Sequence, residues 1–141
     1  MNFRNLIPTA LALAVVALAT SCEDKGTQPK DHPIVGNWRW VSSCGGFAYN
    51  CTWADSTGKF RGVTFERNGR YSEWGDVVFP LASRYHIVRR PRWSPSDSAD
   101  FVLIDNRSPD MYIEKLTKDT LVLSEYCLDC FGHTYVRLGN I

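Results

Sequence analysis

The sequence predicts an all-β protein, a single up-and-down barrel of eight antiparallel strands that follows a signal peptide and a tether. Three observations carry this prediction. After residue 33, apolar residues alternate with polar ones over short segments, turn-forming residues separate these segments, and no segment has a helical apolar pattern three turns long. A barrel is expected because closure removes the exposed edges of the sheet.

The composition is that of one globular domain. Of the 141 residues, 44% are hydrophobic and 22% are charged, which excludes a disordered chain and a fibre. Arg4 is the only charged residue among the first 21, so the rest of the chain carries fifteen basic and fifteen acidic residues. A neutral domain has no overall attraction for nucleic acid, and we expect no nucleic-acid partner.

The first 21 residues have the pattern of a secretory signal peptide. A basic start at Arg4 precedes an apolar run over residues 6–20, which is too short for a typical membrane-spanning helix. The segment Leu18–Cys22 resembles the lipobox of bacterial lipoproteins, which implies that Cys22 is lipidated and becomes the N-terminus. The alternative is an ordinary cleaved signal that ends near a cysteine.

The predicted lipid places the protein in the bacterial cell envelope, with the outer membrane favoured over the inner one. Residues 22–33 contain Pro29 and Pro33 and no apolar periodicity, so they are expected to form a tether. The folded domain is then residues 34–141. We expect it to be a monomer attached to the membrane only through its lipid.

The five cysteines agree with export and lipidation. Lipidation uses Cys22 and leaves Cys44, Cys51, Cys127 and Cys130, enough for two disulfides at one end of the barrel. Their connectivity stays open, because local bridges and cross-links between the two loops are both possible. The Cys127-Leu-Asp-Cys130 motif could also be a redox pair or half of a zinc site, but no helix is predicted after it.

The strands follow from period-two alternation. Trp38 and Trp40 should face inward from the first strand. Asn68-Gly69 predicts a tight turn that places Phe65 opposite Tyr71 and Glu66 beside Arg70. Further strands are expected over residues 84–90, 101–105, 111–116, 121–126 and 133–138.

Two short motifs carry a family resemblance. Gly36-Asn37-Trp38 opens the first strand, and Tyr135-Val136-Arg137 ends the last one. This pair resembles the G-x-W motif and the late arginine of lipocalins, which implies that Arg137 packs over Trp38 and closes one end of the barrel. The segments GNWRWVSSCGGFA, TFERNGRYSEW and YIEKLTKDTLVLSEYCLDCFGHTYVR are similar to the small lipocalin-like lipoproteins of Bacteroidetes-type bacteria.

The inward positions predict a narrow pocket for a small hydrophobic or amphipathic ligand. The residues assigned to it are Trp40, Phe65, Tyr71, Glu73, Tyr85, Ile87, Leu103, Ile113, Leu123 and Tyr135. Apolar rings with a few polar tips suit such a molecule. In the alternative, these side chains fill the barrel and the protein has a structural or protein-interaction role.

No catalytic site, cofactor or metal is predicted. His32 lies in the tether, and His86 and His133 fall on separate strands with no acid spaced for a proton relay. A Ser–His–Asp arrangement would need a nucleophile elbow such as G-x-S-x-G, and the sequence has none. We therefore expect a binding protein that is not an enzyme.

Overall fold

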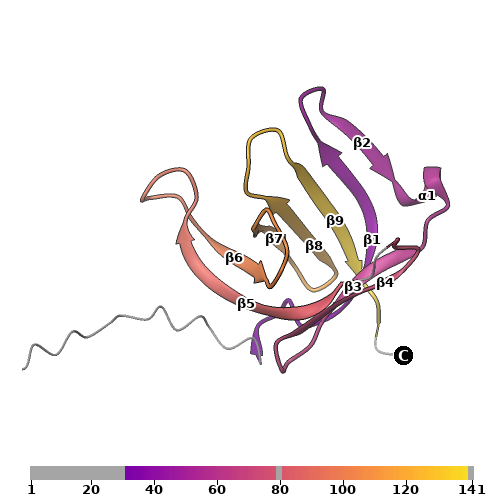
Figure 1. Cartoon of the computed structure of the whole chain (residues 1–141), viewed down its shortest axis with the longest axis horizontal. Coiled ribbons are helices and arrows are strands. Elements are labelled where there is room, and N and C mark those ends of the chain that lie inside the picture. Colours follow the sequence, from indigo (N-terminus) through magenta and orange to yellow (C-terminus); the bar gives the residue numbers. More distant parts are fainter. Residues whose placement is uncertain (1–30, 79–80, 140–141) are drawn as a thin grey trace, which may run out of the picture.

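The barrel begins with β1 (Gly36–Gly45), whose first four residues pair with β3 (Arg61–Phe65) and whose residues from Trp38 onward pair with β9 (Phe131–Arg137). In the computed structural model of Figure 1, residues 31–78 and 81–139 are described. The predicted signal peptide, Cys22 and most of the tether lie outside this part of the chain. None of the helices in the described ranges has the length and apolarity needed to cross a membrane.

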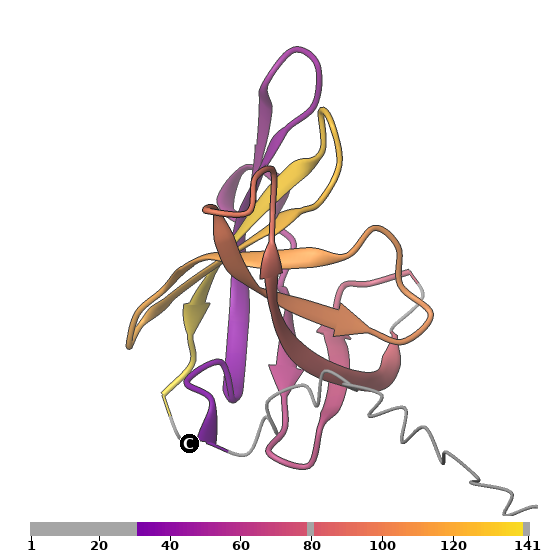
Figure 2. The same ribbon diagram turned by 90° about the vertical axis from the view of Figure 1, so that its left-hand side faces the viewer.

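Eight strands close the barrel in chain order. Besides β1, β3 and β9 they are β4 (Arg70–Gly75), β5 (Ala82–Pro91), β6 (Ser98–Ile104), β7 (Met111–Leu116) and β8 (Thr120–Glu125). Each pairs antiparallel with the next, and the β1–β9 pair completes the circuit (Figures 1 and 2). The predicted fold class is thus confirmed. Closure leaves hydrogen-bonded partners on both sides of these strands.

One strand and a short helix were not predicted. β2 (Asn50–Trp53) folds back on the upper half of β1, and α1 (Ala54–Thr57) connects it to β3. The β1–β2 hairpin and the β8–β9 connection project together from one end of the barrel (Figure 2). Each contains one disulfide, so we name this the disulfide end. The opposite end, where Gly36 and Arg137 lie, is the Trp38 end.

The predicted hairpin has the expected register. Phe65 lies opposite Tyr71, and the ring centroids are 5.3 Å apart. Gly69 has φ +81°, a conformation that glycine adopts without steric cost, and Glu66 approaches Arg70 at 4.0 Å. The aromatic rings face the core while the charged pair stays outside.

The alternation predicted for residues 101–105 is wrong by one position. Val102 and Ile104 lie opposite Ile87 and Tyr85 and join the core, whereas Leu103 is half-buried and lies opposite the exposed His86. The run Phe101–Ile104 is apolar on both faces, so its alternation alone could not show which face points inward.

Phe101 explains why both faces of this run are apolar. Its ring is fully buried outside the main core, with Tyr126 at 5.1 Å and Tyr112 at 5.8 Å between centroids, and with the Arg90 guanidinium at 3.9 Å from its centroid. This cluster packs side chains of β5, β6 and β7 and of Tyr126, which follows β8, against one another.

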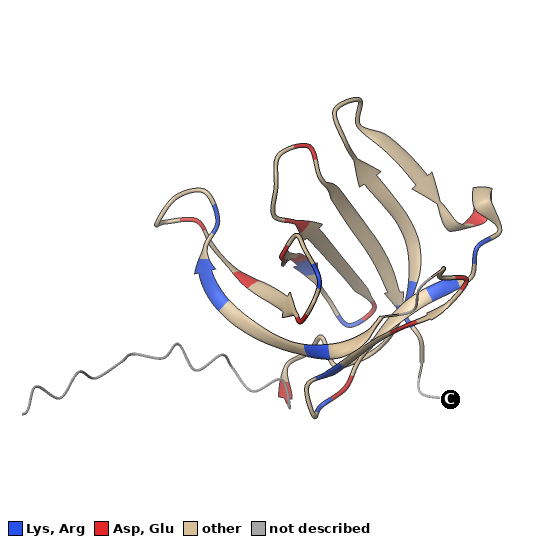
Figure 3. Ribbon diagram, in the orientation of Figure 1, with Lys and Arg blue, Asp and Glu red and all other residues tan. Residues whose placement is uncertain are grey.

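Aspartates neutralise positive charge on the arginine-rich strand β5 and just after it. Two arginines of β5 and the one that follows the strand form ion pairs: Arg89 with Asp100, Arg90 with Asp110 and Arg92 with Asp97. Figure 3 shows both signs of charge interspersed along β5, β6 and the turns. The β1–β2 hairpin differs, because residues 40–54 contain no charged side chain.

Candidate functional site

The Trp38 end is sealed by the contact that the sequence predicted. The Arg137 guanidinium lies 4.0 Å from the ring centroid of Trp38, which is fully buried. Arg137 also donates to the carbonyl oxygens of Val35 at 2.8 Å and Pro33 at 2.6 Å. A Cβ on Gly36, whose φ is +146°, would run into this guanidinium. The cation–π contact is confirmed, and the Arg137 guanidinium covers Trp38 and Gly36 at this end.

Above this seal the barrel is filled. Phe65, Tyr71, Tyr85, Ile87 and Leu123 are buried in one core cluster, and Ile113 packs against it from a half-buried position. Five buried side chains of this size occupy the space that a deep hydrophobic cavity would need. These residues, assigned to a ligand from their alternation, lie in the packed part of the barrel.

A cavity of about 100 Å³ lies above the filled core, toward the disulfide end. Of the residues predicted to line a pocket, Trp40, Glu73 and Tyr135 do so. The remaining lining residues were not predicted: Arg61, Gly62, Val63, Val77, Arg107 and His133. The cavity is therefore smaller and more polar than the sequence suggested.

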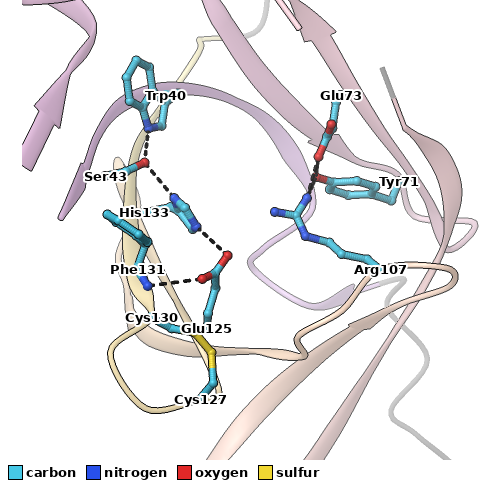
Figure 4. A network of polar contacts seen from close by, with 10 residues as sticks. All are labelled: Trp40, Ser43, Tyr71, Glu73, Arg107, Glu125, Cys127, Cys130, Phe131 and His133. Carbon is cyan, nitrogen blue, oxygen red and sulfur yellow. Dashed lines mark hydrogen bonds and ion pairs between the residues drawn. A yellow bond between two sulfur atoms is a disulfide. The ribbon is translucent and has the colours of Figure 1, made fainter. Parts of the chain in front are cut away.

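One wall of the cavity is a compact polar triad (Figure 4). Arg107 Nη1 donates to Glu73 Oε1 at 2.5 Å and to the Tyr71 hydroxyl at 3.2 Å, and Tyr71 also donates to Glu73 at 2.8 Å. Arg107 and Glu73 are mostly buried, so each supplies the opposite charge that the other needs away from water. Burial raises the pKa of Tyr71 well above its usual value, and the phenol stays protonated.

The opposite wall holds a hydrogen-bonded chain from β1 to β9 and β8 (Figure 4). The Trp40 indole N–H donates to Ser43 Oγ at 2.9 Å, and Ser43 Oγ lies 2.7 Å from His133 Nδ1. His133 Nε2 lies 3.3 Å from Glu125 Oε1, and the Phe131 amide donates to the other carboxylate oxygen. The structure thus gives His133 the acidic neighbour that the spacing of residues did not suggest.

The hydrogen-bond partners in this chain determine the tautomer of His133. The Glu125 carboxylate can only accept, so Nε2 of the neutral ring carries the proton and donates to it. Nδ1 then accepts the hydroxyl hydrogen of Ser43, whose oxygen in turn accepts the Trp40 indole N–H. Burial lowers the pKa of His133 below its usual 6.5, which keeps the ring neutral in this arrangement.

A backbone irregularity brings Ser43 into the chain. The β1–β9 register shifts between Trp40 and Ser42, so Ser43 lies opposite His133 and Trp40 lies opposite Tyr135. Strict alternation from Trp40 would place Ser42 inward instead. The inward direction of Glu125 and Arg61 could have been predicted, because these residues continue the inward alternation of Leu123 and Val63. Arg107 lies on the β6–β7 connection, where no sequence pattern indicates the direction of its side chain.

Tyr135 and Arg61 are polar lining residues whose side chains have no hydrogen-bond or ion-pair partner in the part of the chain that the structure describes. The Tyr135 side chain is 7% exposed, and its hydroxyl forms no hydrogen bond within residues 31–78 and 81–139. Burial raises its pKa to about 12, so it remains a donor at neutral pH. Arg61 stacks at 4.0 Å on the ring of Trp40 and forms no ion pair with any described residue.

The disulfides are local. Cys44 bonds to Cys51 across the β1–β2 hairpin, and Cys127 bonds to Cys130 within the β8–β9 connection. Of the pairings left open by the sequence, the structure thus has the two local bridges. Glu125 lies within 4.8 Å of both sulfurs of the second bridge, but a disulfide offers no thiolate to a metal.

No protein-family model, no curated protein and no solved structure matches this chain.

Proposed function

We propose that this protein is a lipid-anchored envelope protein of the lipocalin-like type whose barrel binds a small amphipathic ligand. The observation that carries the proposal is the cavity of about 100 Å³ between the filled core and the disulfide end. The rings of Trp40 and Tyr135 and the side chains of Val63 and Val77 supply apolar surface, while Arg61, Arg107 and Glu73 supply polar groups. Such a mixture is typical of small-molecule sites.

The size of the cavity limits the ligand. A cavity of about 150 Å³ holds one benzene molecule, so the space here suits about four or five non-hydrogen atoms. The ligand is therefore either a small molecule or the end group of a longer one. We propose no catalytic step, because Ser43 does not line the cavity and its oxygen already accepts the Trp40 indole.

Blocking the cavity tests ligand binding. We expect small molecules that co-purify with the protein to appear in native mass spectra and to raise its melting temperature when added back. Val77→Trp should abolish both effects, since Val77 lines the cavity. Val78→Trp is the matched control, because Val78 is the next residue and is 86% exposed. Equal binding by the two variants would contradict the proposal.

The anchor needs a separate test, because Cys22 lies outside the described residues. We expect labelled fatty acid to enter the wild-type protein and not the Cys22→Ser variant, which should stay as precursor or be released. Two or more acyl chains give a stable attachment where one does not. Failure of the wild-type protein to take up label would disprove the anchor and leave the cavity proposal intact.

The β1–β2 hairpin favours a second candidate, a role in protein interaction. Its tip exposes Phe47 at 96% and Tyr49 at 75% of their surface, and residues 40–54 carry no charge. Exposed aromatic residues on an uncharged loop are typical of contact surfaces. If this role is the main one, Val77→Trp should have no effect and Phe47→Ser should remove the function.

A further inference from the structure

We infer that the cavity takes a small organic anion whose carboxylate lies between Arg61 and Tyr135. This inference rests on the proposed ligand-binding function and adds the chemical class of the ligand. It follows from the charges, the free hydrogen-bond donors and the volume of one site.

The charge of the lining favours an anion. Arg61 and Arg107 contribute two positive charges, and Glu73 contributes one negative charge that Arg107 already neutralises at 2.5 Å. His133 is neutral, because burial lowers its pKa and its ring proton goes to Glu125. The residues that line the cavity therefore carry a net charge of +1, because Glu125 lies behind His133 and not in the lining, and the cation without a counterion among the described lining residues is Arg61.

The lining offers two free donors, the Tyr135 hydroxyl and the Arg61 guanidinium. The Tyr135 hydroxyl forms no hydrogen bond within the described ranges, although 93% of the surface of that residue is covered. The carboxylate of the lining is already neutralised, since Arg107 and Tyr71 both donate to Oε1 of Glu73. A ligand that completes this site must bring acceptor atoms.

A carboxylate matches these donors in shape. Its two oxygens lie in one plane and can accept parallel N–H groups from a guanidinium, leaving a lone pair for a phenol O–H. The contact of Arg61 with the Trp40 ring, 4.0 Å from the guanidinium carbon to the ring centroid, restricts the motion of this side chain before a ligand arrives. Two free donors satisfy a carboxylate better than a phosphate, which has more oxygens to pair.

The volume of the cavity and its apolar lining indicate a short carbon chain. About 100 Å³ accommodates acetate or propionate, with the hydrocarbon part against Val63 and Val77. A longer chain would have to leave the cavity toward the disulfide end. We therefore use propionate as the probe and propionamide as its neutral counterpart of the same shape.

Isothermal titration or NMR titration of the purified protein tests the inference. We expect propionate to bind at least about tenfold more tightly than propionamide, because hydrogen bonds to a charged group are the stronger ones. Arg61→Gln and Tyr135→Phe should each weaken propionate binding and leave propionamide unchanged. Arg84→Gln is the control, an exposed arginine on β5 outside the cavity.

The outcomes separate this inference from the proposed function. Equal binding of propionate and propionamide, both lost in Val77→Trp, would overturn the anion and keep the cavity as a binding site. Propionate binding that survives the combined Arg61→Gln and Tyr135→Phe substitutions would also overturn it. Circular dichroism and melting temperature establish that each variant is folded, and Tyr135→Phe keeps the ring that the core needs.

Discussion

The two ends of this barrel are built from different chemistry. At the Trp38 end, aromatic and aliphatic side chains form a buried core, and the half-buried Arg137 guanidinium is stacked on an indole and bonded to carbonyl oxygens. Toward the disulfide end, the interior contains Glu73, Arg107 and His133 around a cavity. The difference indicates that one half stabilises the fold while the other half is available for a ligand.

The polar half is stable because its two mostly buried carboxylates, Glu73 and Glu125, accept hydrogen bonds inside the protein. Glu73 receives Arg107 and Tyr71, and Glu125 receives His133 and a backbone amide. No buried side-chain polar atom in the described ranges lacks a partner. The Tyr135 hydroxyl is not one of these buried atoms, because Tyr135 lines the cavity. Pairing removes most of the free-energy cost of placing charges beside a core.

The largest expected effect is on the packed half. Trp38→Ala should lower the free energy of unfolding by about 3–5 kcal/mol, because it removes a fully buried indole and its hydrogen bond to the Ile34 carbonyl. Urea denaturation followed by circular dichroism measures the change. Trp53→Ala on β2, where the side chain is 50% exposed, should change stability far less. Equal losses would mean that the Trp38 end is not the stabilising half.

Each disulfide should contribute less to the free energy of unfolding than Trp38 does, because each bridge closes only a local loop. Replacing Cys44 and Cys51 together by serine should cost about 2 kcal/mol, since the bridge closes a short loop. Intact mass spectrometry should first show that reduction adds four hydrogens to the protein, two for each bridge. A smaller mass shift would mean that one pair is free in solution.

Arg137→Ala should have a moderate effect on stability and almost none on ligand affinity. The cation–π contact with Trp38 is worth about 0.5–2 kcal/mol, and Arg137 does not line the cavity. Thermal unfolding measures the loss of stability, and titration of the same sample measures affinity. A large loss of affinity without a loss of stability would show that the two halves are not separate.

The smallest expected effect is a pH dependence from the histidine in the polar half. Burial lowers the pKa of His133 below 6.5, so on acidification the unfolded chain takes up this proton before the folded one. Stability is therefore complete above pH 6.5 and falls as the pH drops from there through the pKa of the folded state. His133→Gln should flatten this part of the curve of unfolding free energy against pH.

Two other histidines serve as comparisons. The pKa of His32 is also lowered by burial, so His32→Gln should remove a further part of the same slope. His86→Gln, at an exposed position on β5, is the control for the substitution itself. A slope that persists in the variant lacking both His32 and His133 would assign it to other groups.

The packed half could be predicted from the sequence, and most of the polar half could not. Alternation about Trp38 and the Asn68-Gly69 turn specify register, because slipping one residue would expose every core side chain. The bulge that turns Ser43 inward has no such signature. Arg107 reaches the cavity from a connection between strands, where neither period nor turn chemistry predicts the direction of a side chain.

NMR titration of the indole N–H groups with propionate tests the division of the barrel most directly. The protein has five tryptophans, and the signals of Trp38 and Trp40 can be assigned by Trp→Phe substitution. We predict that the Trp40 signal shifts as propionate is added and stops shifting when the site is saturated. The reason is that the Trp40 ring lines the cavity and the Arg61 guanidinium stacks on it. The Trp38 signal should stay in place beneath Arg137. Equal shifts of both signals, or a shift of Trp38 alone, would contradict the account.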